Sequence, residues 1–260
     1  MEAVPCIPCL RSRHRDRQQG KTGLLIDRRH PPAVDPFDRR RAIAGTAMLT
    51  FAEEILLLLL GDDGEFTPIQ SERLSCALAG AVLMDLAFAL RIDTDPEELV
   101  VIDPTPTGND ILDPSLTRLA RHELRSHTRT WIKLLSDEGA TAIREQALQS
   151  LVGRGILERR ERKFPWVFGS RRYPPIDGEV EREVKLRISD ILTSDAIPDP
   201  RDVALFGLVA ACDLLVHIFS HRKVSQYHRR IRQLCKMDLI GREVAAAIID
   251  VRLRNMRARL

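Results

Sequence analysis

Apolar residues recur at four-residue steps over a long stretch in the first half of the chain. The series consists of Leu74, Leu78, Val82, Leu86 and Leu90. This spacing stacks side chains on one face of an α-helix. Small residues between them, such as Ala79 and Gly80, would let other helices approach closely. The pattern predicts a central core helix with Ser71 as its N-cap, surrounded by other helices.

Helical patterns also dominate the rest of the chain from Met48 onward. Thr50 and Glu53 have the spacing of a capping box, and apolar residues follow them. Another helix is expected from Asp113 as N-cap, with Pro114 at the first helical position. Further helices are predicted at 130–135, from Ile143 to near Gly153 or Gly155, from Glu179 onward, and at 201–219, 225–236 and 241–254, and a short strand is predicted at 99–102. The predicted fold class is mostly α: a single helical domain around a central apolar helix bundle, with one protruding β-hairpin.

Residues 1–47 differ from the remainder in composition and charge. They contain scattered prolines and arginines without periodicity and carry a net charge of +5, whereas the remainder carries −2. We predict that 1–47 is a disordered extension, or the product of a start assigned upstream of Met48, and that 48–260 is one domain. No secretory signal or membrane span is expected, which predicts a cytoplasmic protein.

The most apolar stretch contains two polar side chains one helical turn apart. Asp213 and His217 are four residues apart within 201–219. Buried polar groups need partners, so this spacing predicts a hydrogen bond between them in the core.

Familiar catalytic and metal-binding motifs are absent from the sequence. Cys6 and Cys9 form a C-x-x-C pair, but no second pair follows at the spacing of a zinc site. His122 and His127 are five residues apart, so they would point about 140° apart on a helix and could not share a zinc ion. No nucleophile elbow or dinucleotide-binding glycine motif occurs. We therefore expect no catalytic residue, no metal ion and no cofactor, and a protein that is not an enzyme.

The clearest functional signal lies between Arg154 and Arg172, a stretch that contains seven Lys and Arg residues and only two Glu residues. Two short basic strands, 156–163 and 168–173, flank an aromatic tip and predict a β-hairpin. The residues expected to insert into a membrane are Phe164, Trp166, Val167 and Phe168. Aromatic rings favour the lipid headgroup region, while guanidinium groups meet lipid phosphates. The expected partner is therefore an anionic phospholipid membrane.

Two other interpretations of this hairpin stay open. The aromatic tip could pack on its own domain, or on a partner subunit to form a homo-oligomer. The order of a helix, a short turn and a basic hairpin also resembles a winged helix, whose wing contacts DNA phosphates. An apolar tip gains nothing from DNA, and residues 141–153 offer only Arg144 as a cation. We therefore expect no nucleic-acid partner and keep a DNA-binding regulator as the alternative function.

Six segments, taken in order, carry a family resemblance. They are LTFAEEILLLLLGDDGEFT at 49–67, LAGAVLMDLAFALRI at 78–92, PTGNDILD at 106–113, TWIKLLS at 130–136, IREQALQSLVGRGIL at 143–157 and DVALFGLVAACDLL at 202–215. The ordered set resembles Golgi phosphoprotein 3 and its yeast and bacterial relatives, over nearly everything from Met48 to about Ile248. Arginine outnumbers lysine by 34 to 6, a bias typical of GC-rich genomes that favours a bacterial-type relative.

The resemblance implies a non-catalytic protein on the cytoplasmic face of a membrane. Members of this family bind phosphatidylinositol 4-phosphate in a basic pocket beside an inserting hairpin, and in eukaryotes they act as Golgi adaptors for glycosyltransferase tails. Membrane-protein tails are therefore expected partners as well.

The resemblance also implies positions for the lipid phosphate. The family holds it with a tryptophan and three arginines, and these positions fall on Gln70, Ala79, Thr141 and Arg144. Only Arg144 keeps the family residue. The other candidate lipid-binding residues are Arg73, Arg171 and Arg172, because guanidinium groups could replace the missing phosphate contacts.

Overall fold

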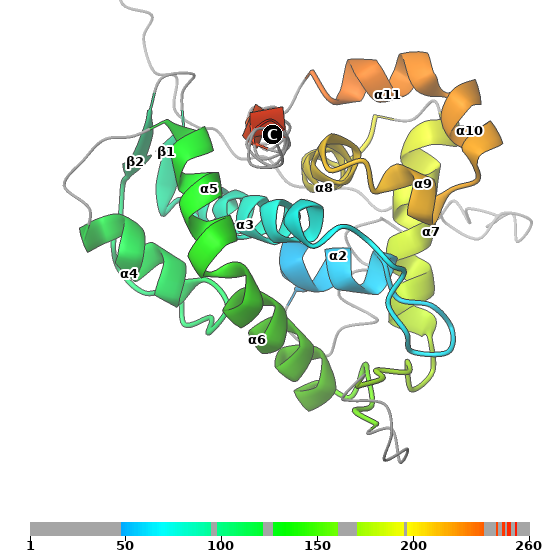
Figure 1. The fold of residues 1–260 in the computed structure, drawn as a ribbon, viewed down its shortest axis with the longest axis horizontal. Coiled ribbons are helices and arrows are strands. Elements are labelled where there is room, and N and C mark those ends of the chain that lie inside the picture. The colour runs from blue at the N-terminus through cyan, green and yellow to red at the C-terminus, as the bar shows by residue number, and fades with distance from the viewer. Residues whose placement is uncertain are drawn as a thin grey trace, which may run out of the picture.

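The computed structural model describes residues 48–94, 98–121, 127–160, 171–194 and 197–236, and six positions between 243 and 253. Residues 1–47 lie outside the described part, as do the four predicted inserting residues Phe164, Trp166, Val167 and Phe168. The elements are α2 (Phe51–Leu58), α3 (Ser71–Phe88), β1 (Ile92–Thr94), β2 (Leu99–Val101), α4 (Asp113–Arg121), α5 (Thr128–Glu138), α6 (Ala140–Gly153), α7 (Glu179–Thr193), α8 (Pro200–Ala211), α9 (Leu215–Ile218), α10 (His221–Gln226) and α11 (His228–Leu234). Figure 1 shows a mostly helical fold with a small antiparallel sheet, which confirms the predicted fold class.

Helix α2 begins with the capping box that the sequence predicts. Thr50 Oγ1 accepts the N–H of Glu53 at 3.2 Å, and Glu53 Oε2 accepts the N–H of Thr50 at 2.7 Å. Every residue of α2 is buried, including Glu53 and Glu54. Adjacent residues point to different faces of a helix, so these two carboxylates need separate buried partners.

Helix α3 is the central helix that the four-residue repeat predicts. It packs against α2, α5, α6 and α8 (Figure 1), and its residues from 76 to 86 are all buried. Its N-cap is Gln70 rather than Ser71, because Ser71 is the first helical residue and its hydroxyl donates to Glu72 instead. Leu90 lies beyond the end of the helix with φ 55° and is 72 % exposed, so the buried stripe ends at Leu86.

The sheet consists of β1 and β2 in antiparallel register. Ile92 lies opposite Val101, and Thr94 lies opposite Leu99. The sequence predicted only the second strand, which belongs to the apolar run at 99–102. The first strand is short and contains the polar residues Asp93 and Thr94, so it gives no such signal.

Asp113 closes the loop between β2 and α4. Its carboxylate accepts the N–H groups of Thr107 at 2.7 Å and Gly108 at 3.0 Å. Asp113 is the first residue of α4 rather than its N-cap, and its side chain bonds the preceding loop instead of the helix. Assignments of helix ends differ by about one residue, but these bonds show that the predicted capping role was wrong.

Helices α5 and α6 follow one another through Gly139 alone. The stripe predicted for α6 is buried, as Ile143, Ala147 and Leu151 show. The helix ends at Gly153, and Gly155 follows with φ 70°. A glycine in this conformation is a common helix stop, so the predicted C-terminus is confirmed.

The C-terminal half follows the predicted pattern less closely. Helix α7 begins at Glu179 as expected, but the helix predicted over 201–219 is broken into α8 and α9. The break lies at Asp213, which has φ 57°, a left-handed conformation that a right-handed helix cannot continue through. Asp213 and His217 are both exposed, so the core hydrogen bond predicted between them was wrong.

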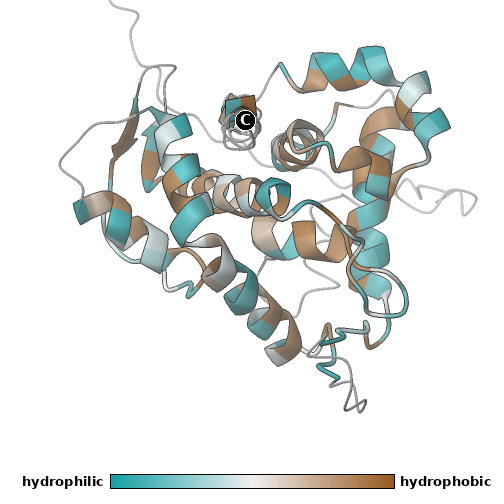
Figure 2. Ribbon diagram, in the orientation of Figure 1, coloured by the Kyte–Doolittle hydropathy of each residue, from teal (hydrophilic) through white to brown (hydrophobic). Residues whose placement is uncertain are grey.

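Helices α10 and α11 take the place of the single helix predicted over 225–236, with Tyr227 between them. Most of the helix predicted over 241–254 lies outside the described residues. Figure 2 shows mostly hydrophobic colours along the central helices and alternating hydrophilic and hydrophobic colours along α10 and α11. In the described part of the chain, no helix is long and apolar enough to cross a membrane.

Candidate functional site

The base of the predicted basic hairpin is antiparallel. The backbone groups of Arg160 and Arg172 exchange hydrogen bonds of 2.9 and 3.0 Å, and Leu157 forms a second bridge with Pro175. The aromatic tip lies outside the described residues. The structure therefore agrees with the predicted pairing at the base, and the fate of the tip stays a prediction.

A tight turn after α2 packs on this base. Gly64 O accepts the N–H of Tyr173 at 2.9 Å, and Gly64 has φ 76°. A Cβ atom at this position would lie 2.3 Å from the nitrogen of Pro174, so only glycine allows so close a contact. The turn positions Phe66, whose ring lies 6.2 Å from that of Tyr173.

Arg144 lies directly beside this turn. Its guanidinium stacks over the ring of Phe66 at 4.9 Å, a cation–π arrangement. The side chain is half-buried, and its Nε is buried without a hydrogen-bond partner. No carboxylate of the described residues forms an ion pair with it. Arg144 is thus a partly desolvated cation whose charge no carboxylate in the described part of the chain neutralises.

Two of the other predicted lipid-binding residues lie near Arg144. Arg172 pairs with Glu65, the neighbour of Phe66, at 2.5 Å. Arg171 pairs more loosely with Glu145, the neighbour of Arg144, at 3.9 Å. We call Arg144, Arg171 and Arg172 the arginine cluster. All three come from segments that meet at the turn after α2, and the side chains of Arg171 and Arg172 are 51 and 37 % exposed.

Arg73 is not part of this cluster. It forms an ion pair with Asp213 at 3.2 Å, at the end of α8. The Arg73 guanidinium therefore borders a different part of the surface, and its proposed lipid contact stays a prediction.

The other positions implied by the family resemblance differ in exposure. Gln70 and Thr141 are exposed, and Thr141 lies one turn before Arg144 on α6. Ala79 is fully buried in α3 and cannot touch a ligand. Of the four implied positions, three are therefore accessible, and only Arg144 contributes a charge.

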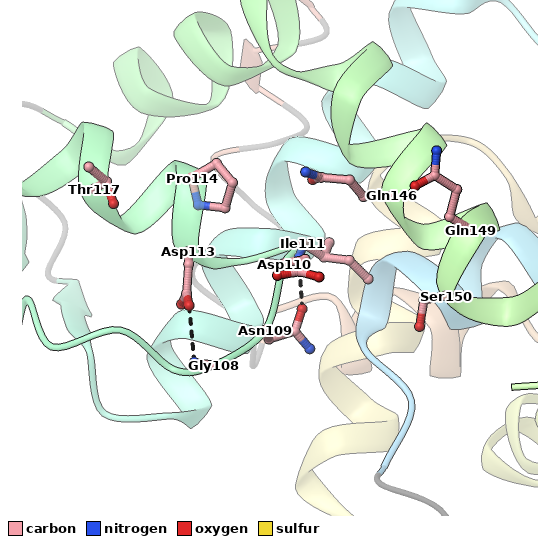
Figure 3. Close-up of a pocket in the computed structure, with 10 residues that line it drawn as sticks. All are labelled: Gly108, Asn109, Asp110, Ile111, Asp113, Pro114, Thr117, Gln146, Gln149 and Ser150. Atoms are coloured by element: carbon pink, nitrogen blue, oxygen red, sulfur yellow. Dashed lines mark hydrogen bonds between the residues drawn. The ribbon is translucent and has the colours of Figure 1, made fainter. Parts of the chain in front are cut away.

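A polar cavity of about 760 Å³ lies between the loop before α4 and the outer face of α6 (Figure 3). Its lining residues are Gly108, Asn109, Asp110, Ile111, Asp113, Pro114, Thr117, Gln146, Gln149 and Ser150. Two carboxylates and no lysine or arginine line it, so it is unsuited to a lipid phosphate. Within the described ranges, no group of three or more His, Cys, Asp or Glu side chains could hold a metal ion.

A second set of charged residues, which the sequence analysis missed, lies inside the helix bundle. We call Glu54, Asp85, Arg187, Arg201 and Asp202 the buried ion network. Arg201 bonds Asp85 at 3.0 Å and the carbonyl of Leu49 at 2.7 Å. Arg187 bonds Asp202 at 2.6 Å and also contacts Glu54. The network therefore joins α2, α3, α7 and α8.

Burial governs the titration of these carboxylates. It raises the pKa of Asp85 from 3.8 to about 7, against the opposing effects of Arg201 and the N–H of Phe51. Burial likewise raises the pKa of Glu54, although Arg187 and Arg201 oppose it. In the sequence both acids stand within apolar helices, and their arginine partners lie far along the chain. The only signal for them was a charged residue at a position expected to be buried.

Glu53, on a different face of α2 from Glu54, forms a separate buried contact. It accepts the hydroxyl of Ser150 at 2.6 Å and lies 3.4 Å from Arg154. These contacts tie the end of α6, and with it the start of the hairpin segment, to the core.

Comparisons with known proteins match the chain along most of its length. Residues 51–251 match the family model described as Golgi phosphoprotein 3 (GPP34). The chain is 31% identical over 190 residues to vacuolar protein sorting-associated protein 74 of Schizosaccharomyces pombe, covering 65% of this chain and 56% of that protein. It is 28% identical over 241 residues to the protein of the same name from Eremothecium gossypii, covering 85% and 66%. The chain thus spans between about half and two thirds of the length of these relatives.

Proposed function

This chain belongs to the Golgi phosphoprotein 3 family, and from that premise we propose that it is a non-enzymatic peripheral membrane protein. It binds anionic phosphoinositide lipid through the arginine cluster, with phosphatidylinositol 4-phosphate as the headgroup that the family implies. The segment at 156–173 inserts its aromatic tip beside that site, on the cytoplasmic face of the membrane.

The environment of Arg144 is the observation that supports this proposal most. A half-buried guanidinium without a carboxylate partner is costly unless an anion neutralises it. The stack on Phe66 holds the guanidinium in place at 4.9 Å. A phosphate group is a suitable ligand, because a guanidinium can donate two parallel hydrogen bonds to it.

Neighbouring residues would add smaller contributions to membrane binding. Near an anionic surface each Lys or Arg contributes about 1 kcal/mol, and burial of an aromatic side chain contributes roughly 1.5–3 kcal/mol. Arg171 and Arg172 are exposed enough to reach lipid by exchanging Glu145 and Glu65 for phosphate. The sum predicts reversible attachment rather than permanent anchoring.

An adaptor role follows as the second part of the proposal. The relatives are named for vacuolar protein sorting, so we propose that this chain also sorts membrane proteins by holding their tails at the bilayer.

Liposome co-sedimentation tests the lipid proposal. The parent is expected to sediment with vesicles that contain phosphatidylinositol 4-phosphate, and to remain in solution with neutral vesicles. Arg144→Ala and Trp166→Ala are each expected to lower the bound fraction about tenfold. Arg118→Ala is the matched control, because Arg118 is also a half-buried helical arginine but lies on α4, paired with Glu138.

A DNA shift assay in parallel decides between the two functional classes. If the parent ignores anionic vesicles but binds duplex DNA with steep salt dependence, the winged-helix function replaces the one proposed here.

A further inference from the structure

The segment 221–236 is the most basic stretch of the described chain outside the arginine cluster. It contains Arg222, Lys223, Arg229, Arg230, Arg232 and Lys236 but no Asp or Glu. It forms α10 and α11, at the opposite end of α7 from the hairpin base (Figure 1).

Two of these cations fix the segment to the domain. Lys223 Nζ donates to the hydroxyl of Ser189 at 2.6 Å and lies over the ring of Phe219. Arg230 donates to the carbonyls of Ile191 at 2.7 Å and Ser194 at 3.1 Å. These carbonyls are at the end of α7, where a cation satisfies otherwise unbonded groups. Structural roles therefore account for Lys223 and Arg230.

The other four cations have no such role. Arg222, Arg229, Arg232 and Lys236 are exposed, and none forms an ion pair with a described residue. Two of them, Arg232 and Lys236, border a groove of about 670 Å³ between α8, α9, α10 and α11.

The floor of this groove is apolar. Its aliphatic lining residues are Ala210, Ala211, Leu215, Val216, Val224 and Ile231. Val216 is 38% exposed. On the other edge Arg73 and Asp213 form an ion pair, and their charges cancel. Arg232 and Lys236 therefore leave a positive net charge around the apolar floor. An apolar floor with a charged border suits an amphipathic helix, which places its apolar face in such a groove.

We infer that this groove binds an acidic amphipathic helix of a partner protein. The partner places aliphatic side chains on the floor and glutamates or aspartates against Arg232 and Lys236. This inference concerns a surface separate from the arginine cluster and does not depend on lipid binding.

Charge disfavours two occupants from this chain itself. Residues 1–47 carry a net charge of +5, so they would be repelled by the groove. A second copy docked by two-fold symmetry would set the same cations against each other.

Distance disfavours the membrane as the occupant. The hairpin base precedes α7, whereas α10 and α11 pack on its last turn. Because α7 has 15 residues, the two surfaces are separated by about 22 Å along that helix. This exceeds the Debye length of about 8 Å at physiological salt. Attachment through the hairpin, as in the proposed function, would therefore leave this surface free to hold a partner.

Fluorescence anisotropy with defined peptides tests the inference. The probe is a labelled synthetic helix with leucine at i, i+3, i+4 and i+7 and glutamate at most other positions. The comparison peptide has lysine in place of every glutamate. The parent is expected to bind the acidic peptide at micromolar concentration, more weakly as salt rises, and to bind the basic peptide at least tenfold less tightly.

Two groove variants and one control locate the binding. Val216→Glu and the double change Arg232→Glu with Lys236→Glu are each expected to weaken acidic-peptide binding at least tenfold. The control is Arg222→Glu with Arg229→Glu, at positions of α10 and α11 that are also exposed but do not border the groove. It is expected to change the affinity less than threefold. The double variants alter only exposed side chains, so they decide the matter even if Val216→Glu does not fold.

Three results overturn the inference. They are failure of the acidic peptide to bind the parent, equal loss in the groove and control double variants, and loss of anionic-liposome binding in the Arg232 and Lys236 variant as large as that of Arg144→Ala. The last result assigns the groove to the membrane instead.

Discussion

The buried ion network and the arginine cluster use the same side chain in opposite ways. Arg201 is 10% exposed and contacts Asp85, Glu54 and the carbonyl of Leu49. Arg144 is half-buried, contacts an aromatic ring and has no carboxylate partner among the described residues. A guanidinium whose charge is met inside the protein stabilises the fold, whereas one whose charge is left open can receive an anion. The comparison therefore separates structural arginines from the proposed lipid-binding arginines by their partners rather than by their exposure alone.

Removal of Arg201 is expected to have the largest effect on stability. Arg201→Ala leaves Asp85 and Glu54 buried without this cation, and it also removes the stack on Phe51 at 3.8 Å. We expect the free energy of unfolding to fall by about 3–5 kcal/mol, measured by chemical denaturation. Arg201→Lys keeps the charge but loses the planar guanidinium. Its free energy of unfolding should lie between those of the parent and Arg201→Ala. A loss below about 1 kcal/mol would show that the network is not structural.

The pH dependence of stability sharpens the same point. The pKa of Asp85 is raised from 3.8 to about 7 in the folded chain. Protonation of Asp85 therefore stabilises the folded state relative to the unfolded state. This contribution is complete below about pH 4 and is lost as the pH rises to about 7. The variant D85N cannot lose a proton. We expect the stability difference to shift in favour of the variant by roughly 2–4 kcal/mol between those pH values. Parallel curves for the two proteins would contradict the raised pKa.

Arg172 should give the smallest change in stability. Its pair with Glu65 is partly exposed, at 37 and 44%, and such pairs contribute about 0–1 kcal/mol. Arg172→Ala should therefore leave the melting temperature within about 3 °C of the parent while it weakens binding to anionic vesicles. A large loss of stability would place Arg172 with the structural arginines and break the comparison.

Local patterns were sufficient to predict much of the fold. The capping box at Thr50, the central helix and the start of α7 depend on neighbours within a few residues, which periodicity and caps report directly. The break at Asp213 could not be predicted in this way. Only its backbone conformation and its contact with Arg73 identify it.

The candidate site was predicted only in part, because only some of its features lie within one stretch of sequence. The basic composition around 156–173 is visible in one stretch of sequence, and Arg144 came from the family resemblance. Their convergence depends on the turn at Gly64. This turn brings Phe66 to Arg144, 78 positions away, and bonds Gly64 to Tyr173, 109 positions away, so it leaves no trace in the local sequence. The buried ion network escaped prediction because most of its pairs join residues far apart in the sequence, as the separation of 116 positions between Asp85 and Arg201 illustrates.

Titration of the protein with a soluble short-chain phosphatidylinositol 4-phosphate tests the role of Arg144 most directly, since it removes any contribution from the inserting tip. Isothermal calorimetry should detect binding to the parent and to Arg118→Ala with similar affinity, and binding at least tenfold weaker to a folded Arg144→Ala variant. Equal affinities for the parent and Arg144→Ala would contradict the claim that this arginine is left open to receive a lipid phosphate.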